Sequence, residues 1–282
     1  MDAFATHAVD FGRGIGIALL QTLAYYLFFL VIERFVPAER NQPFSAIRFN
    51  LLYLPFYLIG TALLLPVTTA LVVGQLKSHY PQMFGLMPLD SWLDATLRGV
   101  VYLAIFDFAY YWFHRLQHTW PLLWSQHKLH HSDTSLNVTT ALRHHWLEEP
   151  LRVFVMVLPM AILFDLTPAY SAGLAFVLSF WGFYIHTNLN MHFGVVNRLL
   201  CTPQLHRLHH SLRVEHHDCN FAAIFPIFDV LFGTYVSPKR DEVPETGLYG
   251  GETVTTIRQA NLLPFRDWRL RIRRKPTVMR PG

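Results

Sequence analysis

Long uncharged stretches dominate the first third of the chain. Residues 14–32 carry no charge, and residues 49–76 form a second uncharged run of 28 residues. A helix needs about 20 apolar residues to cross the ~30 Å hydrocarbon core of a bilayer. Both stretches therefore predict membrane-spanning helices, with Pro55 and Pro66 at the points where the second would bend.

Two further apolar regions contain polar interruptions. Residues 99–113 contain a single charge, Asp107, and residues 153–185 are divided by a break at 165–168 that predicts a helical hairpin. We therefore predict an all-α integral membrane helical bundle of about four spans, the last of which could be the hairpin. A large soluble bundle is the alternative, but the first two runs lack amphipathic periodicity, which disfavours it.

The composition agrees with a membrane protein and adds an anomaly. Only 15% of the residues are charged, against about 25% in soluble domains. Histidine is unusually abundant, and 14 of the 16 histidines lie between His114 and His217. The two cysteines, Cys201 and Cys219, form no CxxC pair, so thiolate metal sites and disulfide scaffolds are disfavoured. Clustered imidazoles on an apolar chain indicate a membrane-attached metal site.

Three histidine clusters have helical spacing. HRLQH places two histidines four residues apart, whereas HKLHH and HRLHH use spacings of three and four. Positions i, i+3 and i+4 share a helix face, so each cluster can direct its imidazoles at a common centre. Eight histidines exceed the four ligands of a tetrahedral ion, which predicts two metal ions. They are His114, His118, His127, His130, His131, His206, His209 and His210.

Basic residues predict which side of the membrane carries the histidines. With the N-terminus outside, the segments rich in Lys and Arg fall in the cytoplasm together with every histidine cluster and the C-terminus. The segment 265–280 interleaves seven cations with aromatic and aliphatic residues, a pattern suited to anionic lipid headgroups. No nucleic-acid-binding module is visible, so nucleic acid is a disfavoured partner.

The motifs HRLQH, HKLHHSDTSLNVTTALRHHWLEE, HTNLN and TPQLHRLHHS resemble the membrane di-iron fatty acid hydroxylase and sterol desaturase superfamily over residues 95–235. The resemblance implies a cytosolic histidine cap that holds two iron ions and uses dioxygen to hydroxylate or desaturate a lipid C–H bond. It adds His145 and His186 as ligands, although Trp146 stands where the family usually has proline. Asn190 stands where some fatty acid hydroxylases have a further histidine, so that ligand is either absent or replaced by an amide or by water.

Carboxylates near the histidines are expected to support the ligands. Asp107 shares a helix face with His114, and an intramembrane carboxylate indicates function, so we favour contact with a ligand imidazole over direct ligation of a metal or a structural hydrogen bond. Glu148 either orients His145 or is a solvated carboxylate. His144 is expected to point away from the centre, since adjacent residues on a helix diverge.

The implied reaction needs an electron donor. The chain shows no flavin, dinucleotide or haem-attachment motif, so electrons are expected from a separate cytochrome or ferredoxin. Zinc sits above iron in the usual affinity order, so zinc could replace iron in purified protein. The alternative function is a membrane zinc hydrolase that uses the same histidines, with Glu148 as its base.

We divide the chain into three parts. Residues 1–94 form N-terminal transmembrane helices, and residues 95–236 form the catalytic domain with the third span and the hairpin. Residues 237–282 form a basic cytosolic or interfacial tail.

Overall fold

The described part of the protein consists of helices joined by loops. The computed structural model describes residues 3–87 and 95–273, and no strand occurs within these ranges. Two isolated antiparallel bridges join loops, one between Pro37 and Leu189 and one between Ser211 and Thr246. The predicted all-α fold is confirmed, while the boundary placed at residue 94 lies outside the described residues.

Within residues 3–87 and 95–273, three helical segments are long and apolar enough to cross a membrane. The first is Val9–Glu33, within α1 (Ala3–Glu33). The second is Phe44–His79, which comprises α2 (Phe44–Thr69), the π-helical η1 (Ala70–Gly74) and α3 (Gln75–His79). The third is α8 (Pro168–Ile185). At most 17% of the most apolar window of each segment is buried. Their apolar side chains therefore face outward, as expected of helices that contact the hydrocarbon of a bilayer.

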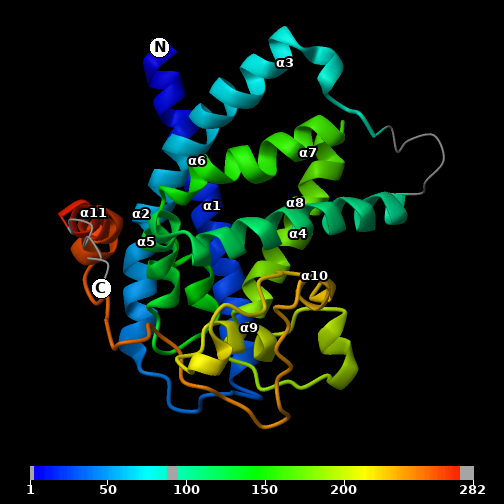
Figure 1. The fold of residues 1–282 in the computed structure, drawn as a ribbon. Helices are drawn as coiled ribbons and strands as arrows, with labels where there is room; N and C mark the ends of the chain where they lie inside the picture. Colours follow the sequence, from blue (N-terminus) through cyan, green and yellow to red (C-terminus); the bar gives the residue numbers. More distant parts are fainter. Residues whose placement is uncertain (1–2, 88–94, 274–282) are drawn as a thin grey trace, which may run out of the picture.

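The expected bend of the second span lies after Pro66. Proline lacks the N–H that would donate within the helix and clashes with the preceding turn. The helix continues past it, but widens to the π-helical η1 from Ala70 onwards. In Figure 1 this segment turns aside towards α3 at the end of the molecule that also holds the N-terminus.

The third expected span, residues 99–113, lies within α4 (Ala95–Thr119), which is not among the three candidate spans. This helix carries Arg98, Asp107 and Arg115 among its apolar residues. Figure 1 shows α4 running across the direction of α1 instead of alongside it. The structure thus gives three candidate spans where the sequence indicated about four.

The fourth apolar region is divided into two helical arms, as expected for a helical hairpin. Its first arm contains α6 (Glu148–Arg152), the π-helical η5 (Val153–Val157) and α7 (Leu158–Leu163), and its second arm is α8. However, Figure 1 shows the end of the first arm, α7, running across the direction of the second instead of antiparallel to it. Thr167 begins α8 as its N-cap, accepting a hydrogen bond from the Tyr170 backbone N–H, with Pro168 at the first helical position. The polar break at 165–168 is therefore a helix boundary.

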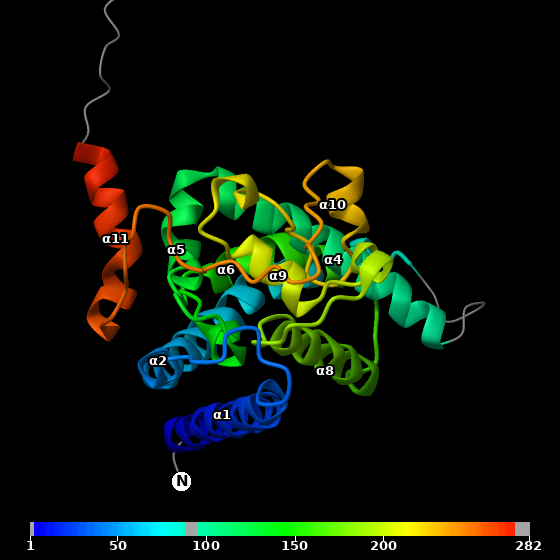
Figure 2. The same cartoon turned by 90° about the horizontal axis from the view of Figure 1, so that it is seen from below.

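Short helices gather at one end of the candidate spans and form a cap (Figures 1 and 2). Glu33, the last residue of α1, joins the spans to this cap by accepting hydrogen bonds from the Val138 and Asn188 backbone N–H groups. The helical elements of the cap are α5 (Pro121–His131), η4 (Val138–Leu142), η6 (Gly194–Arg198), α9 (Pro203–His209), η7 (Val214–His216) and α10 (Ile227–Leu231). A short 3₁₀ turn, η2 (Pro81–Met83), follows α3.

The predicted tail, residues 237–282, begins as an irregular segment up to residue 256 and then forms a helix. Helix α11 (Ile257–Arg273) packs against α5 and runs across the direction of α1 (Figures 1 and 2). Its buried residues include Ala260 and Leu263, while the exposed residues include Arg258, Arg266, Arg269, Arg271 and Ile272. The remaining cations of the predicted tail, Arg274, Lys275 and Arg280, lie outside the described residues.

An aromatic core joins the spans to the cap. Tyr26 and Phe29 of α1, Tyr53 of α2 and Phe183 of α8 are buried together with Leu129 of α5. Complete burial of one such side chain contributes about 1.5–3 kcal/mol. The position of α5, which carries three of the clustered histidines, is therefore set by the same core that holds the spans together.

Candidate metal centre

Four helices bring nine histidines into two adjacent groups. The imidazoles come from α4, from α5, from the residue after α8 and from α9 with its C-cap. In each group the donor nitrogens all lie within 4.8 Å of one another. The first group contains His114, His118, His127, His131 and His209. The second contains His130, His186, His206 and His210.

Each HxxHH motif supplies both groups. In α5, His127 and His131 join the first group while His130 joins the second, and in α9 His206 and His210 join the second while His209 joins the first. Successive residues of an α-helix diverge by about 100°. The last two histidines of each motif therefore point to different groups, and the expectation of one common centre per motif does not hold.

The spacing of the nitrogens fits metal ions. The Nε2 atoms are 3.1 Å apart between His118 and His131, 3.1 Å between His130 and His186, and 2.9 Å between His186 and His206. Two nitrogens held about 2.1 Å from one ion at roughly a right angle would be about 3 Å apart. The pairs therefore have the separation that a shared ion imposes.

Backbone carbonyls select the nitrogen that is free to bind. The Nδ1 atom of His114 lies 2.8 Å from Phe221 O, that of His209 lies 2.7 Å from Cys219 O, and that of His186 lies 2.6 Å from Gly182 O. A carbonyl can only accept, so each Nδ1 carries the proton and each Nε2 keeps its lone pair. These three imidazoles are fixed in the tautomer that a metal requires.

The turn after α9 makes two of these contacts possible. Asp218 and Asn220 both have φ of 54°, in the left-handed region, which Asp and Asn enter more readily than other non-glycine residues. The neighbouring carbonyls of Cys219 and Phe221 accept from the imidazoles of His209 and His114. Two polar residues with no imidazole thus shape the first group.

Burial keeps the imidazoles neutral. It lowers the pKa of His127 to about 4 and the pKa of His186 to about 3. Burial, together with the neighbouring imidazoles, also holds the pKa of His130, His206 and His210 well below the usual value. Neutral imidazole is the form that ligates metals, so the site is prepared for ions at neutral pH.

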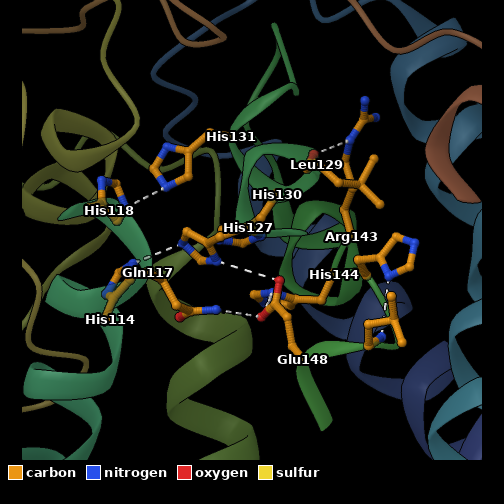
Figure 3. A network of polar contacts seen from close by, with 12 residues as sticks. His114, Gln117, His118, His127, Leu129, His130, His131, Arg143, His144 and Glu148 are labelled. Carbon is orange, nitrogen blue, oxygen red and sulfur yellow. Dashed lines mark hydrogen bonds and ion pairs between the residues drawn. The ribbon is translucent and has the colours of Figure 1, made fainter. Parts of the chain in front are cut away.

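Glu148 is the buried carboxylate of the site (Figure 3). Its Oε1 lies 3.6 Å from His127 Nδ1, and its Oε2 lies 3.2 Å from His144 Nδ1. The Gln117 side chain donates to Oε2 over 3.0 Å. Glu148 was expected to orient His145 or to be solvated, whereas it contacts the two other histidines.

The expected positions of His144 and His145 are reversed. His145 was expected among the ligands and His144 away from them, but His144 lies beside the histidine groups and His145 lies apart from them. The His145 imidazole lies outside both groups, with Nε2 3.1 Å from Asn261 O and Nδ1 accepting from the Leu147 N–H. The His144 ring instead stacks on His130, with centroids 4.1 Å apart. Residues 143–147 precede α6 and are not helical, so the helical rule used for His144 does not apply there.

Asp107 acts on the backbone of a distant loop. It is fully buried, and its carboxylate accepts hydrogen bonds from the N–H groups of Ala223, Ile224 and Phe225. The contact expected with a ligand imidazole is replaced by these bonds. Asp107 thereby holds the loop that follows Phe221, whose carbonyl accepts from His114.

Asn190 is positioned through its backbone. Its N–H donates to Val36 O, next to the bridge between Pro37 and Leu189. The neighbouring Asn188 makes the side-chain contacts in this region, since its Oδ1 accepts from Arg207 and from the Glu39 N–H. Asn190, four residues after His186, belongs to neither histidine group.

Two cavities reach the histidines. A polar pocket of about 140 Å³ is lined by His118, His131 and His209 of the first group, together with Asp218 and Tyr249. An apolar cavity of about 250 Å³ is lined by His186 of the second group, by His144 and Arg152, and by hydrophobic residues. Those residues include Phe106, Met156, Trp181 and Ile224.

The sequence profile described as "Fatty acid hydroxylase" matches residues 99–234, which contain all nine grouped histidines. These residues belong to the fatty acid hydroxylase family. The resemblance found from the motifs is therefore confirmed, and the histidine groups lie inside the fatty acid hydroxylase domain.

Several curated proteins are similar to this domain. Alkylglycerol monooxygenase of Xenopus tropicalis is 37% identical over 58% of this chain and 34% of its own length. Human alkylglycerol monooxygenase is 37% identical over 53% of this chain and 32% of its own length. Ornithine lipid hydroxylase OlsE of Rhizobium tropici is 28% identical over 83% of this chain and 70% of its own length. The chain thus spans about a third of the alkylglycerol monooxygenases that it matches, and no solved structure matches it significantly.

Proposed function

We propose that the protein is a membrane di-iron oxidoreductase that uses dioxygen to hydroxylate or desaturate a C–H bond of a lipid. The observation that carries this proposal is the junction of a buried histidine site with an apolar cavity at His186. The names of the relatives, which include a monooxygenase and a lipid hydroxylase, support the same class of reaction.

One iron would be held by each histidine group. The first would use His114, His118, His127, His131 and His209, and the second His130, His186, His206 and His210. Two irons, when bound, supply the redox chemistry that attack on an unactivated C–H bond needs. Zinc could replace them in purified protein, because imidazole also binds zinc well. His144 and Glu148 support this set, and His145 is omitted because both its nitrogens are engaged elsewhere.

The apolar cavity would hold the lipid chain beside the second group. Phe106, Met156 and Trp181 present hydrocarbon surface and exclude water. Glu148 fixes the imidazoles of His127 and His144 at the border between the site and the cavity. A C–H bond of the chain would then lie against the histidine site in a dry environment.

Electrons would come from a separate cytochrome or ferredoxin. The polar pocket is the part of the site suited to exchange with an aqueous partner, since Asp218 on its wall is exposed. We place this face, the histidines and the C-terminus in the cytoplasm, following the distribution of basic residues.

The zinc hydrolase is not favoured. Its candidate base, Glu148, is fully buried and already contacts Gln117, His127 and His144. A base for hydrolysis must instead reach a metal-bound water beside its substrate.

Isotope labelling tests the proposed reaction. The protein would be loaded with ferrous iron in nanodiscs made from total membrane lipid, supplied with ferredoxin, its reductase and NADPH, and incubated under ¹⁸O₂. Mass spectrometry should detect a lipid with one added ¹⁸O, or one that has lost two hydrogens. Equal product formation without oxygen and reductant would contradict the proposal.

A further inference from the structure

A groove between two candidate spans lies next to the cavity of the metal site. It has a volume of about 630 Å³ between α1 and α8, with Tyr25 and Phe28 on one side and Phe176, Ser179 and Phe180 on the other. This volume is within the ~300–1,000 Å³ typical of small-molecule sites. Because both helices are long and apolar enough to cross a membrane, the groove opens towards the hydrocarbon of the bilayer.

A thin wall separates the groove from the apolar cavity. Ser179 lines both of them. The ring of Phe183, which lines the cavity, stacks on the ring of Tyr25, which lines the groove, with centroids 4.6 Å apart. One small side chain and one pair of stacked rings therefore stand between bilayer lipid and the interior.

The far end of the cavity reaches the histidines by way of the same helix. His186 follows Ser179 by seven residues along α8, a distance of about 10 Å at 1.5 Å per residue. An extended hydrocarbon chain that passes Ser179 is thus within one to two helical turns of the second histidine group.

We infer that a bilayer lipid inserts its hydrocarbon chain laterally between α1 and α8, past Ser179 and the Tyr25–Phe183 ring pair, to reach the metal site. This portal deepens the proposed function and rests on it. The occupant is the acyl or alkyl chain of a lipid already in the membrane. A water-soluble acyl carrier would instead have to approach from the polar side of the cap.

Photo-crosslinking tests the portal without any turnover. The iron-loaded protein is placed in nanodiscs of phosphatidylcholine whose second acyl chain carries a diazirine near its end, illuminated, and digested for mass spectrometry. Phe176 reports labelling in the groove, and Met156 reports labelling in the cavity. In the native protein both residues should acquire lipid adducts.

Three variants decide the route. Ser179→Trp fills the shared wall and should remove the Met156 adduct while leaving the Phe176 adduct. Ala172→Trp is the matched control, because Ala172 lines the groove alone, and it should keep the Met156 adduct. Phe183→Ala opens the ring pair and should increase labelling of Met156, which tests the portal even if Ser179→Trp does not fold.

The outcomes separate this inference from the proposed function. An undiminished Met156 adduct in folded Ser179→Trp protein, or no increase in Phe183→Ala, would overturn the portal and leave the lipid cavity standing. Absence of the Met156 adduct from the native protein would overturn both the portal and the assignment of the cavity to lipid.

Discussion

The two histidine groups share helices α5 and α9 but face different surroundings. Three members of the first group line a polar pocket, where His118 contacts the exposed carboxylate of Asp218. In the second group, His186 lines the apolar cavity. The difference teaches that the proposed centre has a water side and a lipid side, so substitutions on the two sides should have separable consequences.

Loss of a ligand should have the largest effect on either side. His130→Ala in the second group and His209→Ala in the first should each remove about one metal equivalent or abolish turnover, since each deletes a buried ligand nitrogen. Metal analysis of protein purified from membranes measures this. His145→Ala is the control, and a loss of metal in that variant equal to the losses in the other two would show that the grouping is wrong.

Removal of the shared carboxylate should have the next largest effect. Glu148→Gln keeps the size of the side chain but removes the charge that faces His127 and His144. We expect a loss of about 10–100-fold in metal affinity or activity, as for other residues that orient ligands. Titration with ferrous iron measures the affinity.

Glu149→Gln provides the control for this substitution. Glu149 is also buried, but its carboxylate accepts from the Tyr57 hydroxyl and contacts no histidine in the described contacts. Equal weakening of iron binding in both variants would mean that Glu148 acts through the general packing of α6.

A smaller effect is expected on the water side alone. Asp218→Asn weakens the contact of 3.4 Å with His118 Nδ1, but the Asp218 side chain is 63% exposed, and exposed ion pairs contribute little. Iron affinity of the first group should fall by no more than about 10-fold, the lower end for residues that orient ligands. Lipid crosslinking in the cavity should be unchanged. A change in crosslinking at Met156 would show that the polar pocket and the apolar cavity do not act independently.

The smallest expected effect is a loss of overall stability that does not distinguish between the two histidine groups. Helix α11 is joined to α5 by the ion pair of Asp267 with Lys128, which also pairs with Glu252. Asp267→Asn should lower the free energy of unfolding by about 1 kcal/mol, because Glu252 still neutralises Lys128. Thermal unfolding in detergent measures the loss. A selective loss of metal from one group would contradict the shared role of α5.

Much of this organisation could be predicted because it depends on local periodicity. Residues 14–32 and 49–76 lie in candidate spans, and the histidine motifs lie on or beside helices as their spacing indicated. The motifs also identified the family, since they retain its residue types and order. These features need no knowledge of which segments meet in space.

The errors arose where distant segments meet or where the helix ends. Asp107 shares a helix face with His114, but its carboxylate oxygens accept hydrogen bonds from the backbone N–H groups of residues 223–225, more than a hundred positions later in the chain. His144 was assigned by a helical rule to a segment that is not helical. The division of each HxxHH motif between two groups requires a second set of histidines on another helix, which spacing within one motif cannot reveal.

The most direct test of the account is the iron content and Mössbauer spectrum of the protein reconstituted with ⁵⁷Fe(II) in nanodiscs, measured for the native chain and for His206→Ala and His131→Ala. The account predicts two irons per native chain in histidine-rich environments, and one iron in each variant, with a different site lost in the two cases. A single iron in the native chain, or two irons in both variants, would contradict it.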